Sequence, residues 1–83
     1  MKKILKAYLD KQMKDIKNYV LEAKFKKGSY IKWSHDNIIY VEGILSGYTT
    51  ANVFEYDELQ SYYHKLRSYR NILINIEDEL EEV

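Results

Sequence analysis

The sequence has no cysteine and no proline, and it has only three glycines and two arginines among its 83 residues. Without cysteine, disulfide bonds and cysteine-ligated zinc sites are excluded. The lack of proline and the scarcity of glycine argue against linkers and low-complexity segments. A chain this short has a thin hydrophobic core, so its stability requires regular packing or association with another chain.

Long hydrophobic runs are also missing, since none approaches the roughly 20 residues of a membrane-spanning helix. The first residues are basic, but charged residues interrupt the apolar ones every few positions, unlike the continuous apolar region of a signal peptide. The two histidines, His35 and His64, are far apart in sequence, which disfavours a metal site. We therefore expect a soluble cytoplasmic protein with no cofactor, no metal and no membrane partner.

The net charge is zero, but the charges are unevenly distributed along the chain. Residues 1–27 contain nine lysines and three acidic residues, a local charge of +6. Residues 57–83 contain three basic and seven acidic residues, a local charge of −4. This asymmetry favours contact between the first and last segments of the chain.

Residues 3–27 are predicted to form a helix that ends near Gly28. Lys26 and Lys27 complement the negative end of the helix dipole, and glycine suits the position that follows a helix. Apolar residues recur at three- and four-residue spacing, as one face of a helix requires. This face contains Leu5, Tyr8 or Leu9, Met13, Ile16, Val20 and Ala23.

The middle of the chain, by contrast, is rich in β-branched and aromatic residues, which favour strands. The sequence predicts strands at about 29–34, 38–45 and 49–55, with a turn at residues 34–37 ("SHDN"). In the strand at 38–45, Ile39, Val41 and Leu45 share one face and Ile38 lies on the other. Gly43 is expected to mark a bulge or a close approach by a helix.

A second helix is predicted at residues 58–81, with Asp57 as its N-cap and Gln60 completing a capping box. Its apolar residues follow a strict spacing of three and four, and we expect them to pack antiparallel to the first helix within the chain. The apolar residues of this helix are Leu59, Tyr62, Leu66, Tyr69, Leu73, Ile76, Leu80 and Val83. The alternative is that they pack between copies of the chain in a homo-oligomer.

The sequence therefore predicts a small single α+β domain spanning residues 1–83, with the element order α-β-β-β-α. A three-stranded antiparallel meander is flanked by two long helices in this prediction.

Residues that could support catalysis are few. There is no cysteine nucleophile, and the adjacent Ser34, His35 and Asp36 cannot form a catalytic triad, because a triad is assembled from distant segments. The carboxylates near the C-terminus are typical of a solubilising tail rather than an acid–base pair. We expect a protein that is not an enzyme.

Nine tyrosines favour a protein-binding role, because tyrosine combines a large rigid area with a polar tip. Tyr40, Tyr48 and Tyr63 are predicted to lie on the surface and contact a partner protein. The acidic residues of the last helix could engage a basic partner. They are Glu77, Asp78, Glu79, Glu81 and Glu82.

The alternative is a DNA- or RNA-binding regulator that uses lysines to contact phosphates and aromatic rings to stack on bases. The zero net charge, the acidic tail and the scarcity of arginine make nucleic acid the less favoured partner. The residues of this alternative are Lys3, Lys6, Lys14, Lys17, Lys24, Tyr30, Lys32 and Trp33.

The leading hypothesis is a small interaction module that acts as a regulator or inhibitor of another protein. Abundant lysine, isoleucine and tyrosine with little arginine resemble the coding bias of an AT-rich genome. The small size and this bias suggest an accessory or anti-defence protein of a phage or mobile element.

Overall fold

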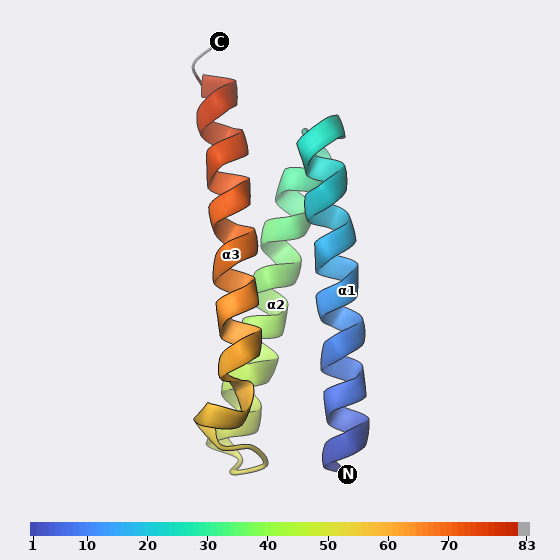
Figure 1. Cartoon of the computed structure of the whole chain (residues 1–83), viewed down its shortest axis with the longest axis vertical. Coiled ribbons are helices and arrows are strands. Elements are labelled where there is room, and N and C mark those ends of the chain that lie inside the picture. Colours follow the sequence, from blue (N-terminus) through green and yellow to red (C-terminus); the bar gives the residue numbers. More distant parts are fainter. Residues whose placement is uncertain (82–83) are drawn as a thin grey trace.

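Three helices make up nearly all of residues 1–81, the part of the chain that this computed structural model describes. They are α1 (Lys2–Lys26), α2 (Ser29–Thr50) and α3 (Tyr56–Glu81). Short loops reverse the chain twice, so α2 runs antiparallel to both of its neighbours (Figure 1). The bundle measures 47 × 17 × 16 Å.

The predicted α+β fold is wrong, because residues 1–81 contain no strand. The three strands predicted at 29–34, 38–45 and 49–55 are replaced by α2 and the loop that follows it. α1 and α3 lie where helices were predicted at 3–27 and 58–81. The error is confined to the middle of the chain, where strand-favouring residues are concentrated.

The sequence of α2 does not show a single apolar helical face, because apolar residues also lie outside the face that is buried. Ile38, Val41 and Leu45 are fully buried, and they follow the spacing of three and four that one helical face requires. Their neighbour Ile39 is 63% exposed, which the alternating pattern of a strand did not predict. Gly43 is on an open surface, where an added Cβ would meet no atom within 4 Å, so it marks neither a bulge nor a close approach.

The predicted turn at residues 34–37 lies inside α2, where its polar side chains bond to the helix backbone. Ser34 Oγ donates to the carbonyl oxygen of Tyr30 at 2.7 Å, and Asn37 Nδ2 donates to the carbonyl oxygen of Trp33 at 2.7 Å. These bonds satisfy groups that would otherwise favour a turn. Ser34 can therefore be fully buried on the core side of the helix.

The two outer helices run parallel, whereas the sequence analysis expected an antiparallel pair. α2 occupies the connection that was assigned to strands, and one helix of similar length between them makes the outer helices point the same way (Figure 1). A salt bridge joins their first turns, with Lys2 Nζ 3.2 Å from Glu58 Oε1. The basic first segment and the acidic last segment therefore contact each other, but as parallel helices.

The hydrophobic core runs along the axis of the bundle and takes residues from all three helices. The apolar face predicted for the first helix is present in α1, where Leu9, Ile16 and Ala23 are fully buried. In α3, Leu59 and Leu73 are also fully buried. Val83, at the end of the predicted apolar series, lies outside the described residues.

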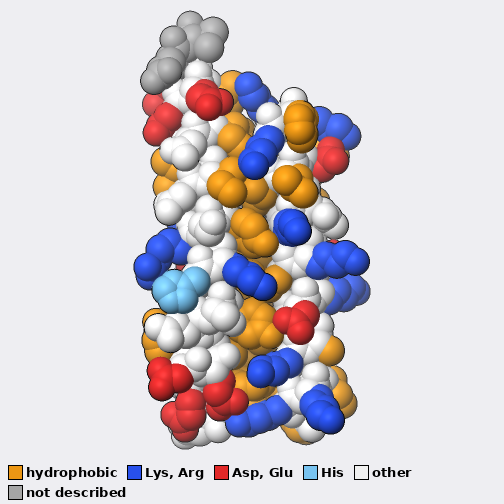
Figure 2. Space-filling model, in the orientation of Figure 1, with side chains coloured by type: hydrophobic (Ala, Val, Ile, Leu, Met, Phe, Trp, Pro, Cys, Tyr) orange, Lys and Arg blue, Asp and Glu red, His pale blue; other side chains and the backbone are white. Residues whose placement is uncertain are grey.

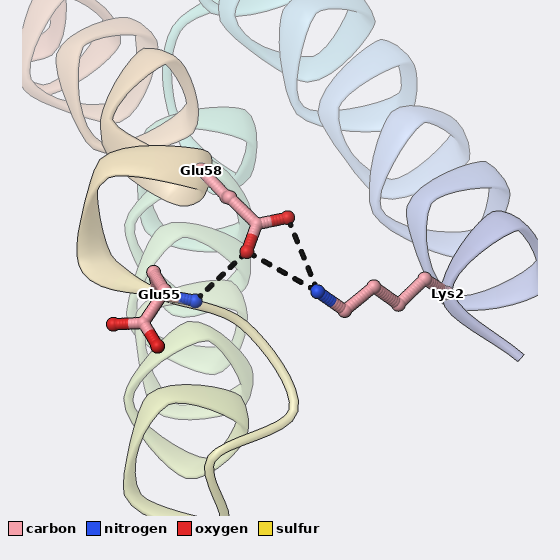
Figure 3. A network of polar contacts seen from close by, with 3 residues as sticks. All are labelled: Lys2, Glu55 and Glu58. Carbon is pink, nitrogen blue, oxygen red and sulfur yellow. Dashed lines mark hydrogen bonds and ion pairs between the residues drawn. The ribbon is translucent and has the colours of Figure 1, made fainter.

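The start of α3 is fixed by Glu58 rather than by the predicted Asp57 cap. Figure 3 shows that the Glu58 carboxylate accepts a hydrogen bond from the backbone N–H of Glu55 at 3.1 Å and also pairs with Lys2. This is half of a capping box, placed two residues earlier than the sequence suggested. The Glu55 N–H, and then the Lys2 ammonium, hold the pKa of Glu58 below its usual value.

Candidate protein interface

The face shared by α1 and α2 gathers five aromatic side chains, which we call the aromatic face. Its α2 residues share one side of that helix, because their spacing of three and seven corresponds to about one and two helical turns. The α1 residues lie opposite them across the antiparallel pair. The aromatic face consists of Tyr8, Tyr19, Tyr30, Trp33 and Tyr40.

Direct contacts connect these rings in two groups. Near the end of α1, Tyr19 lies 6.5 Å from Tyr30, which in turn meets Trp33 edge-on at 5.1 Å. Farther along the same face, the hydroxyl oxygens of Tyr8 and Tyr40 are 3.0 Å apart. The hydrogen bond with Tyr40 is the main reason why the pKa of Tyr8 is raised above its usual value.

Much of the aromatic surface remains open to solvent. Trp33 is 47% exposed, Tyr40 is 53% exposed and Tyr8 is 38% exposed. Ile4, one turn before Tyr8 on the same side of α1, is also exposed. Large aromatic side chains that are rigid and only partly covered are typical of the centres of protein interfaces.

A hollow of about 340 Å³ lies between the two helices beside Tyr19 and Tyr30. Asp15, Asn18 and Glu22 complete its lining. The site is therefore acidic as well as aromatic. Its geometry suits a cation, because carboxylates and the faces of aromatic rings both attract positive charge.

Polar side-chain contacts join α2 to α3. His35 Nε2 lies 2.5 Å from Glu77 Oε1, and Arg70 contacts both carboxylate oxygens of Glu42. Tyr63 stacks on Tyr56 with ring centroids 5.5 Å apart. The contacts of His35 and Arg70 connect α2 with α3, whereas the stack of Tyr63 on Tyr56 lies within α3. All of these groups are less available to a partner.

The partner-binding residues predicted from the sequence are consequently dispersed over the bundle. Tyr40 belongs to the aromatic face, whereas Tyr48 packs against Phe54 with ring centroids 5.7 Å apart and Tyr63 stacks on Tyr56. Glu77 pairs with His35, so the first residue of the predicted acidic surface has a contact within the bundle. Asp78, Glu79 and Glu81 are exposed on α3, and Glu82 lies outside the described residues.

The groove between α1 and α3 contains the basic residues of the nucleic-acid alternative. Lys14 and Lys17 from α1 and Lys65 from α3 line a hollow of about 520 Å³, and Lys24 lines another beside Ile76. Figure 2 shows lysine and arginine side chains on both sides of an apolar stripe along this groove. Lys3 and Lys6 continue the same side of α1 by their spacing.

The aromatic half of that alternative lies elsewhere. Tyr30 and Trp33 belong to the face between α1 and α2, and Lys32 is an exposed residue of α2. A single strand bound along the lysines would therefore not meet these two rings. The bundle separates the phosphate-binding and base-stacking parts that the sequence analysis combined.

Sequence reasoning missed Tyr8 and Tyr19 as members of a site. Tyr8 was assigned as an alternative to Leu9 on the buried face of the first helix, and Tyr19 was not assigned to any surface. The signal in the sequence is that Tyr8 and Tyr19 are eleven residues apart, about three helical turns, which places both on one side of the first helix.

Comparisons of the chain with protein-family models, with curated proteins and with solved structures found no significant match. None of the helices within residues 1–81 has the length and apolar character needed to cross a bilayer. The same residues contain no cluster of three or more histidine and acidic side chains suited to holding a metal ion.

Proposed function

We propose that this protein is a non-enzymatic interaction module that regulates or inhibits a partner protein, and that the aromatic face is its contact surface. The observation that supports this proposal is the joint exposure of Trp33, Tyr40 and Tyr8 on one side of the α1–α2 pair. Aromatic rings lose little conformational freedom on binding and bury a large area, so a few of them can provide most of the binding energy.

Contacts within the aromatic face favour a protein partner over nucleic acid. Trp33 and Tyr30 pack in a T-shaped pair, and the hydroxyl of Tyr40 is held by that of Tyr8, so these rings are ordered before binding. Carboxylates rather than lysines line the hollow beside them, which would repel phosphates. A role as a phage or mobile-element accessory or anti-defence protein remains a hypothesis based on composition.

Site-specific photo-cross-linking in cells of the encoding organism tests the proposal. A benzophenone amino acid at Tyr40 should form a discrete adduct with one other protein. The same group at Asn71, an exposed position on α3, should not. Equal adducts from both positions, nucleic-acid adducts, or adducts between two copies of this chain would each contradict the proposal.

The purified partner then permits a quantitative measurement. Trp33→Ala or Tyr40→Ala should weaken binding at least about tenfold in calorimetry, which corresponds to about 1.4 kcal/mol. Tyr63→Ala is the matched control, because Tyr63 stacks on Tyr56 on another face, and it should change the affinity less than about twofold. Similar losses in all three variants would rule out the aromatic face as the contact surface.

A further inference from the structure

The hollow beside Tyr19 and Tyr30 already has a cation at its edge, supplied by the protein itself. The ammonium of Lys26 lies 5.5 Å from the centre of the Tyr30 ring and 2.9 Å from a carboxylate oxygen of Glu22. Both distances are those of favourable cation–π and ion-pair contacts. The geometry thus shows that a basic side chain fits between this ring and this carboxylate.

Lys26 does not neutralise the hollow. Asp15 contributes a second carboxylate to the lining, and the Lys26 ammonium pairs with the other carboxylate, that of Glu22. The Lys26 side chain is 62% exposed, and exposed ion pairs between neighbouring turns of a helix contribute little to stability. Lys26 can therefore move into solvent without a change in the fold.

We propose that this hollow receives a lysine or arginine side chain from a basic segment of the partner protein, with Lys26 displaced. This inference rests on the proposed function and adds the chemical character of the partner. The incoming cation would contact the Tyr30 ring and the carboxylates of Asp15 and Glu22. Trp33 and Tyr40 would then meet the apolar residues that flank it.

Charge and ring geometry select a basic partner over other kinds. An acidic segment would be repelled by the two carboxylates. A purely apolar segment would remove water from the carboxylates without supplying hydrogen bonds in its place. A basic side chain gains the carboxylates and the ring face together, and its apolar stem can lie along Tyr19.

Trp33 provides the measurement, because it is the only tryptophan in the chain and its ring contacts Tyr30. A nona-arginine peptide should change the Trp33 emission in a saturable way, and a nona-glutamate peptide should leave it unchanged. Free arginine at the same residue concentration should have a much smaller effect. An equal effect of free arginine would indicate a small-molecule site and overturn the proposal.

Three variants test the proposal through the change that each should cause in the affinity for the arginine peptide. Asp15→Asn with Glu22→Gln should weaken peptide binding at least about tenfold, and Lys26→Gln should strengthen it by removing the internal competitor. Glu55→Gln with Asp57→Asn makes the same charge change at the end of the loop before α3 and in the first turn of α3, where neither side chain lines the hollow, and should remain within about twofold of the wild type. All variants should keep the wild-type helical circular dichroism.

The outcomes separate this inference from the proposed function. An equal loss in the control variant, weaker binding by Lys26→Gln, or an unchanged Trp33 emission would each overturn the basic-partner proposal. If the cross-linked partner still depends on Trp33 and Tyr40 in that case, the interaction function stands. If the peptide binds as expected but Tyr40 forms no protein adduct, the hollow binds basic segments and the proposed function is wrong.

Discussion

Ile38→Ala should lower the free energy of unfolding by about 2–5 kcal/mol, whereas Ile39→Ala should change it by no more than about 0.5 kcal/mol. The two residues are chemically identical neighbours in α2. Ile38 is fully buried in the core, and Ile39 is 63% exposed. Truncation of the first leaves a cavity among α1, α2 and α3, while truncation of the second removes only surface contacts.

Urea denaturation of both variants and the wild type measures this difference. If Ile38→Ala is too unstable to fold, Ile38→Val should still cost about 0.5–1.5 kcal/mol, because it removes one buried methyl group. Equal losses at the two positions, or a larger loss at Ile39, would contradict the burial pattern of α2 and would agree better with an alternating strand.

Tyr62 should make the protein sensitive to alkaline pH. Burial raises the pKa of this phenol from 10.0 to about 12, and the hydrogen bond that its hydroxyl donates to Asp10 Oδ1 at 2.8 Å adds to the effect. The side chain is only 7% exposed. Folding therefore favours the neutral phenol, and a displacement of two pKa units corresponds to about 2–3 kcal/mol of stability.

The sign of this effect sets the pH window. The folded pKa of Tyr62 is higher than the unfolded one, so its contribution is complete below pH 10 and is lost as the pH rises towards 12. Tyr62→Phe should cost about 1–3 kcal/mol at pH 7 through loss of the bond to the Asp10 carboxylate. Its difference from the wild type should then shrink between pH 10 and 12.

Denaturant titrations across that pH range provide the comparison. Tyr63→Phe is the related control, because burial also raises the pKa of Tyr63, but that side chain is only half-buried and should remove less of the pH dependence. If the curves of the wild type and Tyr62→Phe remain parallel up to pH 12, the phenol is neither buried nor bonded to Asp10 in the folded protein.

The two outer helices could be predicted from the sequence because the spacing of their apolar residues fits a helix and no other regular structure. In α1 the charged residues separate Leu9, Met13 and Ile16 so regularly that only a helix places them on one face. In α3 the same holds for Leu66 and Leu73, and the structure buries both.

The middle helix was missed because local preference and tertiary packing disagree there. Ile39 and Tyr40 interrupt the helical spacing with apolar residues that the structure exposes, and Ser34 places a polar residue on the buried face. The bond from Ser34 Oγ to the Tyr30 carbonyl makes that burial acceptable, but no sequence pattern indicates it. Packing against α1 and α3 then overrides strand preference.

The candidate site was found only in part for the same reason. Tyr40 was selected as a surface residue, and Trp33 and Tyr30 were selected for a different ligand. They become one surface only when residues 29–50 form a helix beside α1. The pairing of Tyr8 with Tyr40 depends on tertiary structure, so single-sequence reasoning had no means of predicting it.

The aromatic face therefore exists only if residues 29–50 form one continuous helix packed against α1. Backbone chemical shifts and nuclear Overhauser effects from NMR in solution test this most directly. We predict helical carbon shifts without interruption from Ser29 to Thr50, together with contacts between the ring protons of Tyr8 and Tyr40. Extended shifts at residues 38–45 with no contact between these rings would contradict both the fold and the site.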